Sequence, residues 1–269
     1  MSSVRQAAVA GLFYPSNAGE LQRDIEHYLS QVSTGKFSAR PKAVIVPHAG
    51  YVYSGITAAS AYASIRPLRG IIQRVVLLGP SHRVRLRGMA VMNVDSFQTP
   101  LGDIPQDSNA IKQLLTLPQI QVMDAAHWQE HSLEVQLPFL QTVLDAFTLV
   151  PIAVGETSST EVEQVLDMLW GGPETLVVVS SDLSHYHDYK TAQTIDRSTC
   201  EAIEQLDIDS IDYEQACGCA AVKGLLLTAK RRNMAVHTLA LSNSGDTAGD
   251  HERVVGYGCW AFCNKGNSQ

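Results

Sequence analysis

Residues 43–50 read AVIVPHAG, and this segment is the clearest indication of the fold class. Its first four residues are apolar, three of them are β-branched, and a proline and His48 follow directly. A continuous apolar run of this length is typical of a strand that is covered on both faces of its sheet. Ligands of open α/β sheets bind outside the carboxyl ends of the strands, so the same stretch places His48 where a site residue is expected.

Two further apolar runs end in the same way. Residues 75–78, VVLL, continue into GPSH and end at His82, and residues 176–179, LVVV, continue into SSDLSH and end at His185. Other strands are expected at residues 149–154, 236–241 and 254–262, and helices at residues 17–31, 56–65, 108–115, 133–144, 159–169, 192–206 and 216–231. This alternation predicts a single α/β domain with a mostly parallel central sheet and helices on both faces, to which the closing strands can add antiparallel pairs. We expect the domain to span residues 1–263 and a polar tail to occupy residues 264–269.

The composition excludes several classes of protein. Acidic residues outnumber basic ones by 27 to 20, which argues against a nucleic-acid-binding protein. The chain has no apolar run long enough to span a membrane, and the N-terminus lacks the pattern of a signal peptide. We therefore expect a cytoplasmic protein that binds neither nucleic acid nor membrane.

The cysteines are odd in number and form no CxxC pair. This pattern does not support a zinc knuckle or a disulfide framework. Cys217 and Cys219 lie in an apolar stretch that resembles a helix. We expect both to be buried free thiols.

Three histidines at strand ends, His48, His82 and His185, are candidate ligands of one metal ion, because imidazole suits iron, copper, zinc and nickel. Two histidines with a carboxylate would favour non-haem iron, whereas three histidines with an open position would favour zinc and an activated water. Asp182 shares a loop with His185 and can orient it as a general acid or base. Asp182 can equally be a helix N-cap.

Four other residues are candidates for contact with a substrate. Residues 127–134, HWQEHSLE, suggest a pocket role for His131 and Glu134, with metal chelation by His127 and His131 as a less favoured alternative. Ser81 directly precedes His82. Tyr53 is expected to share one side of an extended segment with Tyr51 and to offer its hydroxyl to the pocket.

Six short motifs, in order from residue 7 to about residue 258, resemble the MEMO family: AVAGLFYP, VPHAGYVYSG, LLGPSH, EHSLEVQLPFL, SSDLSHY and SGD…VVGYG. The resemblance implies the fold of class III extradiol dioxygenases and a site for non-haem iron, or for copper as in animal members. It also implies that His48 and His82 are metal ligands and that His185, beside Asp182, is the acid/base.

One position departs from the family pattern. Counting back from Gly256 places Thr247 where the dioxygenases have a third ligand, Glu, and where animal members have Cys. A neutral hydroxyl is a poor ligand for a divalent metal. Asp246 or His185 then completes the site, or the site binds metal weakly.

Three functions remain open from the sequence. The first is metal-dependent redox chemistry, of oxygenase type, on a small molecule or a protein. The second is a binding module for a phosphopeptide or protein partner, with a vestigial metal site. The third is a zinc hydrolase that uses His48, His82 and His185. The resemblance also implies an AMMECR-like protein and a radical-SAM protein as pathway partners.

Overall fold

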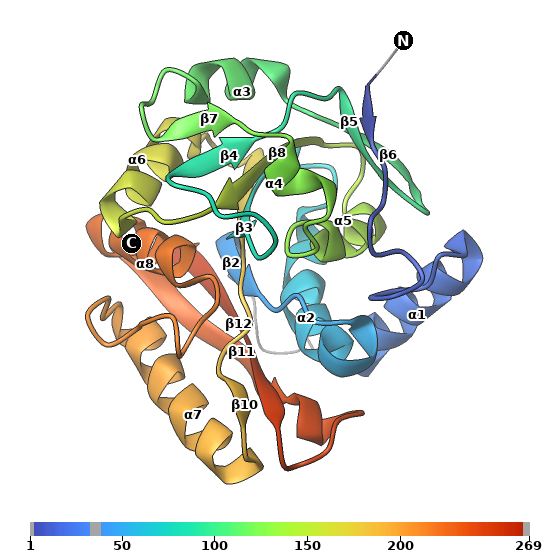
Figure 1. Ribbon diagram of the computed structural model, residues 1–269, viewed down its shortest axis with the longest axis vertical. Helices are drawn as coiled ribbons and strands as arrows, with labels where there is room; N and C mark the ends of the chain where they lie inside the picture. The colour runs from blue at the N-terminus through green and yellow to red at the C-terminus, as the bar shows by residue number, and fades with distance from the viewer. Residues whose placement is uncertain (1–2, 33–38, 266–269) are drawn as a thin grey trace.

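The computed structural model describes residues 3–32 and 39–265, and its centre is a mixed sheet (Figure 1). Four parallel strands form the middle of the sheet in the order β2 (Pro41–Val46), β9 (Thr175–Ser180), β3 (Arg74–Pro80) and β8 (Thr148–Val154). Antiparallel pairs extend both edges. At one edge, β12 (Val254–Asn264) follows β2 and pairs with β11 (Met234–Asn243) and β10 (His185–His187). At the other, β4 (Met89–Val91) pairs antiparallel with β8 and is followed by β7 (Ile120–Val122), which is parallel to β4. The predicted parallel sheet and its antiparallel closing strands are confirmed.

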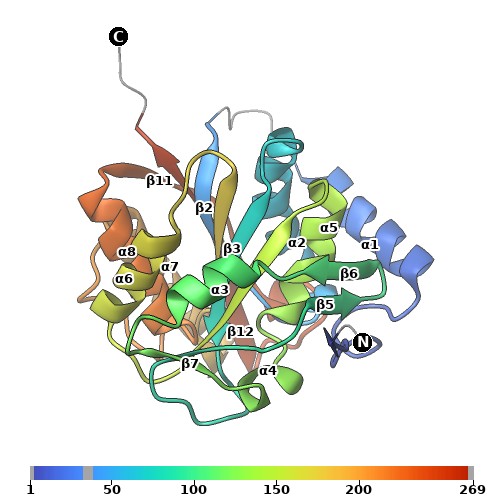
Figure 2. The ribbon, with the colours of Figure 1, turned by 90° about the horizontal axis from the view of Figure 1, so that it is seen from above.

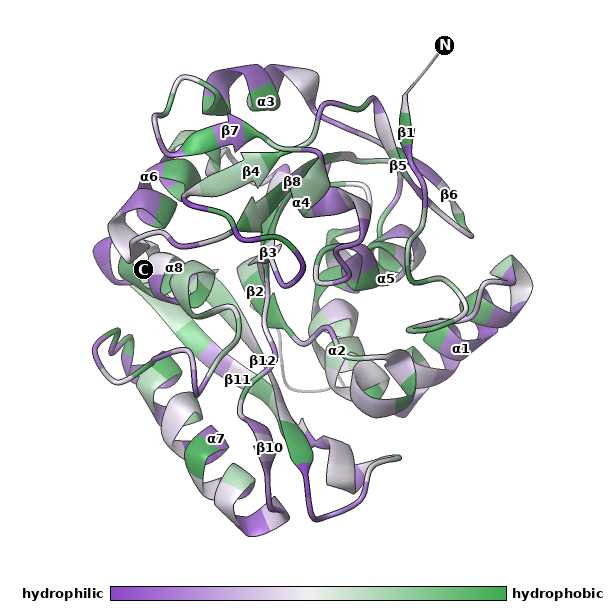
Figure 3. Ribbon diagram, viewed as in Figure 1, coloured by the Kyte–Doolittle hydropathy of each residue, from purple (hydrophilic) through white to green (hydrophobic). Residues whose placement is uncertain are grey.

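Helices cover both faces of the sheet (Figure 2). Residues alternate along β2: Val44 and Val46 belong to one hydrophobic cluster, and Ala43 and Ile45 belong to the other. The first cluster packs against α1 (Ala18–Gln31), α2 (Tyr51–Ile65) and α5 (Leu137–Val143), and the second against α3 (Ser108–Leu114), α6 (Ser159–Leu169), α7 (Tyr189–Gln205) and α8 (Cys219–Arg231). The central strands are mainly hydrophobic in Figure 3, as burial on both faces requires.

The remaining elements are short. A second sheet has the order β1 (Val4–Arg5), β5 (Ser96–Thr99) and β6 (Gly102–Pro105). Helix α4 (Ala125–Trp128) and the 3₁₀ helices η1 (Arg66–Leu68), η2 (Glu134–Gln136) and η3 (Ser244–Asp246) complete the list. Strand β12 continues through Asn264, and residues 266–269 of the expected tail lie outside the described residues. In the described part of the chain, no helix is long and apolar enough to cross a membrane.

The start of α2 differs from the sequence expectation. The helix begins at Tyr51, with Gly50 as its N-cap, so Tyr51 and Tyr53 belong to a helical turn and not to an extended segment. Residues two apart lie on different sides of a helix. Tyr51 is accordingly buried, with its hydroxyl donating to the carbonyl of Val135, whereas Tyr53 is 39% exposed.

Helices α6 and α8 meet closely at Gly224, and this contact gives a stability prediction. A Cβ atom on Gly224 would lie 2.4 Å from Cγ1 of the buried Val162. We expect Gly224→Ala to lower the free energy of unfolding by about 1–3 kcal/mol, because the overpacking outweighs the higher helix propensity of alanine. Urea denaturation measures the change. Gly19→Ala in α1 is the matched control, since no atom lies closer than 3.4 Å there; equal stability of the two variants would contradict the prediction.

Candidate metal centre

Three imidazoles, those of His48, His82 and His131, converge at the carboxyl ends of the central strands. One nitrogen from each lies within 4.8 Å of the other two. His48 follows β2 and His82 follows β3, while His131 comes from the segment between α4 and η2. The ring centroids of His48 and His82 are 5.2 Å apart, and that of His131 lies 5.4 Å and 4.7 Å from them.

The hydrogen bonds of His48 fix which of its nitrogens is free. Its Nδ1 lies 2.8 Å from the hydroxyl of Ser180, and that hydroxyl donates its own proton to the carbonyl of Ser132 at 2.6 Å. Ser180 must therefore accept from Nδ1, which places the ring proton there and leaves a lone pair on Nε2. Nε2 lies 3.4 Å from Sγ of Cys217 and 4.0 Å from Oδ2 of Asp182. A neutral imidazole held in this way is the usual form of a metal ligand.

Glu130 holds Nδ1 of His82, as Ser180 holds Nδ1 of His48. Its Oε1 lies 2.9 Å from Nδ1 of His82, and its Oε2 accepts the backbone N–H of His82 at 2.6 Å. The backbone N–H groups of His131 and Ser132 also donate to Oε1. Burial raises the pKa of this carboxyl, but the hydrogen bonds and charge of His82 and the backbone donors outweigh it and hold the pKa at about 2. Glu130 is thus a buried carboxylate that orients two of the three histidines.

The third histidine, His131, has a buried nitrogen that makes no hydrogen bond among the described residues. This nitrogen, Nδ1, lies 3.3 Å from Oε1 of Glu130, and the centroid of the ring lies 4.7 Å from that of Phe13. Burial lowers the pKa of His131, and burial together with the neighbouring imidazoles lowers the pKa of His48 well below its usual value. Both rings are therefore neutral near pH 7, which is the form that binds a metal ion. This set of donors fits a transition metal.

His185 and Asp246 lie outside this group. Nδ1 of His185 is 2.7 Å from the carbonyl oxygen of Leu183. The two carboxylate oxygens of Asp246 accept hydrogen bonds from the hydroxyl of Tyr189 and from the backbone N–H of Asn243, the N-cap of η3. Among the described residues the geometry therefore offers His131, and not His185 or Asp246, as the third donor.

Two other candidate residues have structural contacts that the sequence did not indicate. Asp182 is buried and accepts the backbone N–H of His48 at 2.6 Å, and burial raises its pKa. Glu134 is fully buried and binds Arg5, the hydroxyl of Tyr14 and the backbone N–H groups of Ala8 and Val9. The expectation of a substrate contact for Glu134 is corrected, because its oxygens anchor the N-terminal segment.

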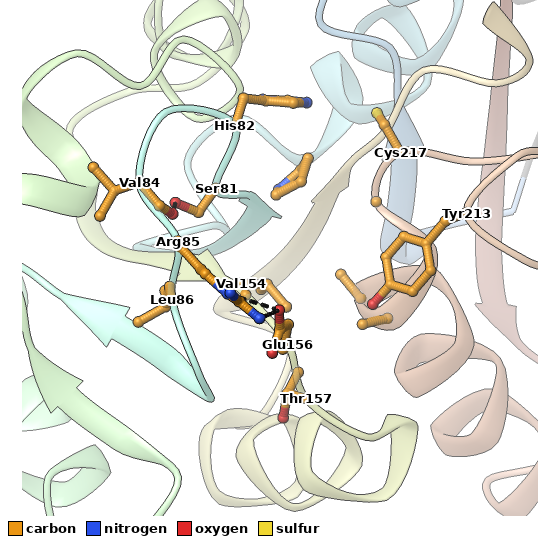
Figure 4. A pocket seen from close by; sticks show the side chains of 15 residues that line it. Ser81, His82, Val84, Arg85, Leu86, Val154, Glu156, Thr157, Tyr213 and Cys217 are labelled. Atoms are coloured by element: carbon orange, nitrogen blue, oxygen red, sulfur yellow. Dashed lines mark hydrogen bonds and ion pairs between the residues drawn. The ribbon is translucent and has the colours of Figure 1, made fainter.

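A cavity of about 520 Å³ opens beside the histidines (Figure 4). Ser81, His82 and Cys217 line one end, and the Arg85–Glu156 ion pair lies farther along. The hydroxyl of Ser81 donates to the carbonyl of Val84, and Tyr53 is not among the lining residues. Our sequence reasoning missed Glu130 and Cys217 as site residues. Glu130 stands next to His131 in the sequence, but no sequence signal places Cys217 near His48. All five cysteines are free in the structure, as expected, but Cys217 is only half-buried, whereas Cys219 is buried.

The fold and the histidine group define an α/β protein with a mixed central sheet and a candidate metal centre. A solved structure, that of the uncharacterized protein JW3007 from Escherichia coli K12, superposes with a TM-score of 0.55 at 11% identity and covers 81% of this chain and 98% of its own. The family model described as Memo-like protein matches residues 5–261. MEMO1 family proteins of Thermoplasma volcanium and Aquifex aeolicus are 34% and 35% identical, over 97% and 94% of this chain and 99% and 97% of theirs. The chain belongs to the Memo-like family.

Proposed function

We propose that this protein is a metal-dependent enzyme that carries out redox chemistry of oxygenase type on a small molecule. The observation that carries the proposal is the convergence of three imidazoles, two of them with their second nitrogen held by Ser180 and Glu130. Iron or copper is the proposed metal, and zinc is the less favoured one. When bound, such an ion would supply a redox centre and a Lewis acid.

The charges around the cavity favour a small molecule over a phosphopeptide. Among the described residues that line it, Arg85 is the one permanent cation, and it is paired with Glu156 at 3.1 Å. The buried carboxylates of Glu130 and Asp182 lie close behind the histidines. A phosphate group would lie near negative charges and would find the one cation already paired, which disfavours its binding. A largely uncharged ligand does not face this repulsion. The cavity volume is also in the range usual for small-molecule sites.

His185 remains our proposed acid/base. Its Nδ1–H can donate to the carbonyl of Leu183, which would leave Nε2 to accept or release a proton. The charge interaction with His185 lowers the pKa of the Asp182 carboxyl, but burial raises this pKa by more. We further propose that an AMMECR-like protein and a radical-SAM protein act in the same pathway. The cytoplasmic location is a prediction too.

Metal analysis of purified protein tests the proposal. We expect about one iron or copper ion per chain, and we expect His48→Ala and His82→Ala each to lose most of it because each removes a ligand. His131→Ala should lower the metal content more than His185→Ala does. His27→Ala, on the exposed side of α1, is the control and should retain the metal.

Retention of metal by both His48→Ala and His82→Ala would overturn this assignment. Protein that takes up no metal and binds a phosphotyrosine peptide would instead support the binding module. Stoichiometric zinc with no iron or copper would support the hydrolase. Protein that holds iron or copper should then be assayed for oxygen consumption with small aromatic substrates.

A further inference from the structure

Tyr213 is an aromatic side chain at the cavity that has no partner in the described part of the chain. It lines the cavity and is 63% exposed. Among the described residues its hydroxyl has no hydrogen-bond partner, and its ring packs on no other ring. A tyrosine in this state offers a flat apolar face and a polar tip, the combination that makes tyrosine common in binding sites. Tyr213 is therefore available to a molecule that enters the cavity.

The turn that carries Tyr213 is held by its own hydrogen bonds. The backbone N–H groups of Gln215 and Ala216 donate to the carbonyl of Asp212 at 3.2 and 3.1 Å. Ile211, which directly precedes the turn, is buried and anchors it. A side chain that is presented from such a fixed base loses little conformational freedom when a ligand binds.

Most of the cavity wall near Tyr213 is apolar. Figure 4 shows Tyr213 on the opposite side of the cavity from Val84 and Arg85, with its hydroxyl pointing toward Glu156. Arg85 and Glu156 neutralise each other at 3.1 Å. The apolar lining residues are Pro80, Val84, Leu86, Val154, Ala220 and Ala221. A ligand at this end therefore contacts apolar surface and hydrogen-bonding groups without a net charge.

We propose that Tyr213 is a specificity-determining residue whose ring stacks on an uncharged planar ring of the substrate, at the end of the cavity away from the histidines. The inference rests on the proposed function, because it places the reacting group of the same small molecule at the other end, beside His82. A cavity of about 150 Å³ holds a benzene molecule. The observed volume of about 520 Å³ therefore has room for such a ring in addition to the reacting group. The substrate class is an elongated, uncharged molecule with a ring remote from the group that reacts.

The chemistry of Tyr213 favours a planar ring over other apolar groups. A contact between two aromatic rings strengthens binding by about twofold to tenfold beyond the effect of the apolar area that it buries. A saturated ring with the same carbon skeleton is not flat and has no π system, so it gains less. Burial, followed by the charges of Cys219 and Glu156, raises the pKa of the Tyr213 hydroxyl. The hydroxyl is therefore protonated near pH 7 and can donate to an acceptor on the ligand.

Calorimetric titration of the full chain with 1-naphthol and with its saturated counterpart, 1-decalol, tests the proposal. Both probes are uncharged and share a carbon skeleton, but only 1-naphthol is planar. We expect the wild-type protein to bind 1-naphthol about threefold to tenfold more tightly than 1-decalol. Tyr213→Ala should bind 1-naphthol about tenfold more weakly and lose this preference, whereas Tyr213→Phe should retain both. Tyr186→Ala is the matched control, because Tyr186 is 62% exposed but is not among the lining residues, and it should behave as wild type.

Equal affinities of the wild-type protein and Tyr213→Ala for 1-naphthol would overturn the proposal, as would an equal loss in Tyr186→Ala or no binding of 1-naphthol by the wild-type protein. The metal content of the same preparations separates this inference from the proposed function. Tyr213→Ala should hold as much metal as the wild-type protein, since Tyr213 lies outside the histidine group. A wild-type protein that takes up no metal, yet prefers 1-naphthol through Tyr213, would contradict the proposed redox function and support the role of Tyr213 in binding.

Discussion

Arg5→Ala is expected to lower the free energy of unfolding by about 3–5 kcal/mol. Arg5 is buried, and its guanidinium binds the carboxylate of Glu134 and the backbone carbonyls of His127 and Glu130. Removing the guanidinium leaves the buried charge of Glu134 without a counter-ion and leaves both carbonyls without these donors. The cost of such uncompensated charge exceeds that of losing an exposed ion pair.

Chemical denaturation measures this change, and Arg231→Ala provides the control. Arg231 pairs with Glu163 and Asp167 on the surface and should cost less than about 1 kcal/mol. The double variant with Arg5→Met and Glu134→Gln should recover part of the loss, because it removes both charges. Equal stabilities of Arg5→Ala and Arg231→Ala would show that the buried pair is not a main anchor of the N-terminal segment.

Glu130→Gln is expected to weaken metal binding by roughly 10–100-fold. A carboxylate accepts on both oxygens, but an amide accepts on one and donates from the other. One of the groups that now donates to Glu130, either Nδ1 or the backbone N–H of His82, would then face an N–H₂ group. The ring of His82 would lose the contact that holds its Nε2 toward the centre.

Competition with a chelator of known affinity measures this change. Glu156→Gln at the cavity wall is the control, because Glu156 is exposed and contacts Arg85 rather than a histidine. A second readout is acid stability. The folded pKa of Glu130, about 2, is below its ordinary value of 4.5, so its stabilising effect is full above pH 4.5 and is lost as the pH falls toward 2. Glu130→Gln should lack this dependence, and unchanged metal affinity would contradict the orienting role.

The two histidines at the strand ends could be predicted as site residues from the sequence, but the third nitrogen donor, His131, could not. His48 and His82 follow apolar runs that can only be buried strands, so their meeting at one sheet edge follows from the geometry of a parallel sheet. His131 and Cys217 instead come from irregular segments that precede helices, and their positions depend on how those segments pack across the sheet edge. The error at Tyr53 has a similar origin, because Gly50 starts the helix earlier than the apolar pattern indicates.

The position of β2 in the sheet has a consequence for synthesis on the ribosome. Its two neighbours, β9 and β12, both come from the second half of the chain. The apolar edge of residues 41–46 therefore emerges long before Thr175–Ser180 has been translated, with no partner for its backbone. Unpaired apolar strands of this kind aggregate readily, and sheets closed by distant segments form slowly. The nascent protein should accordingly depend on a holding chaperone until β9 has been made.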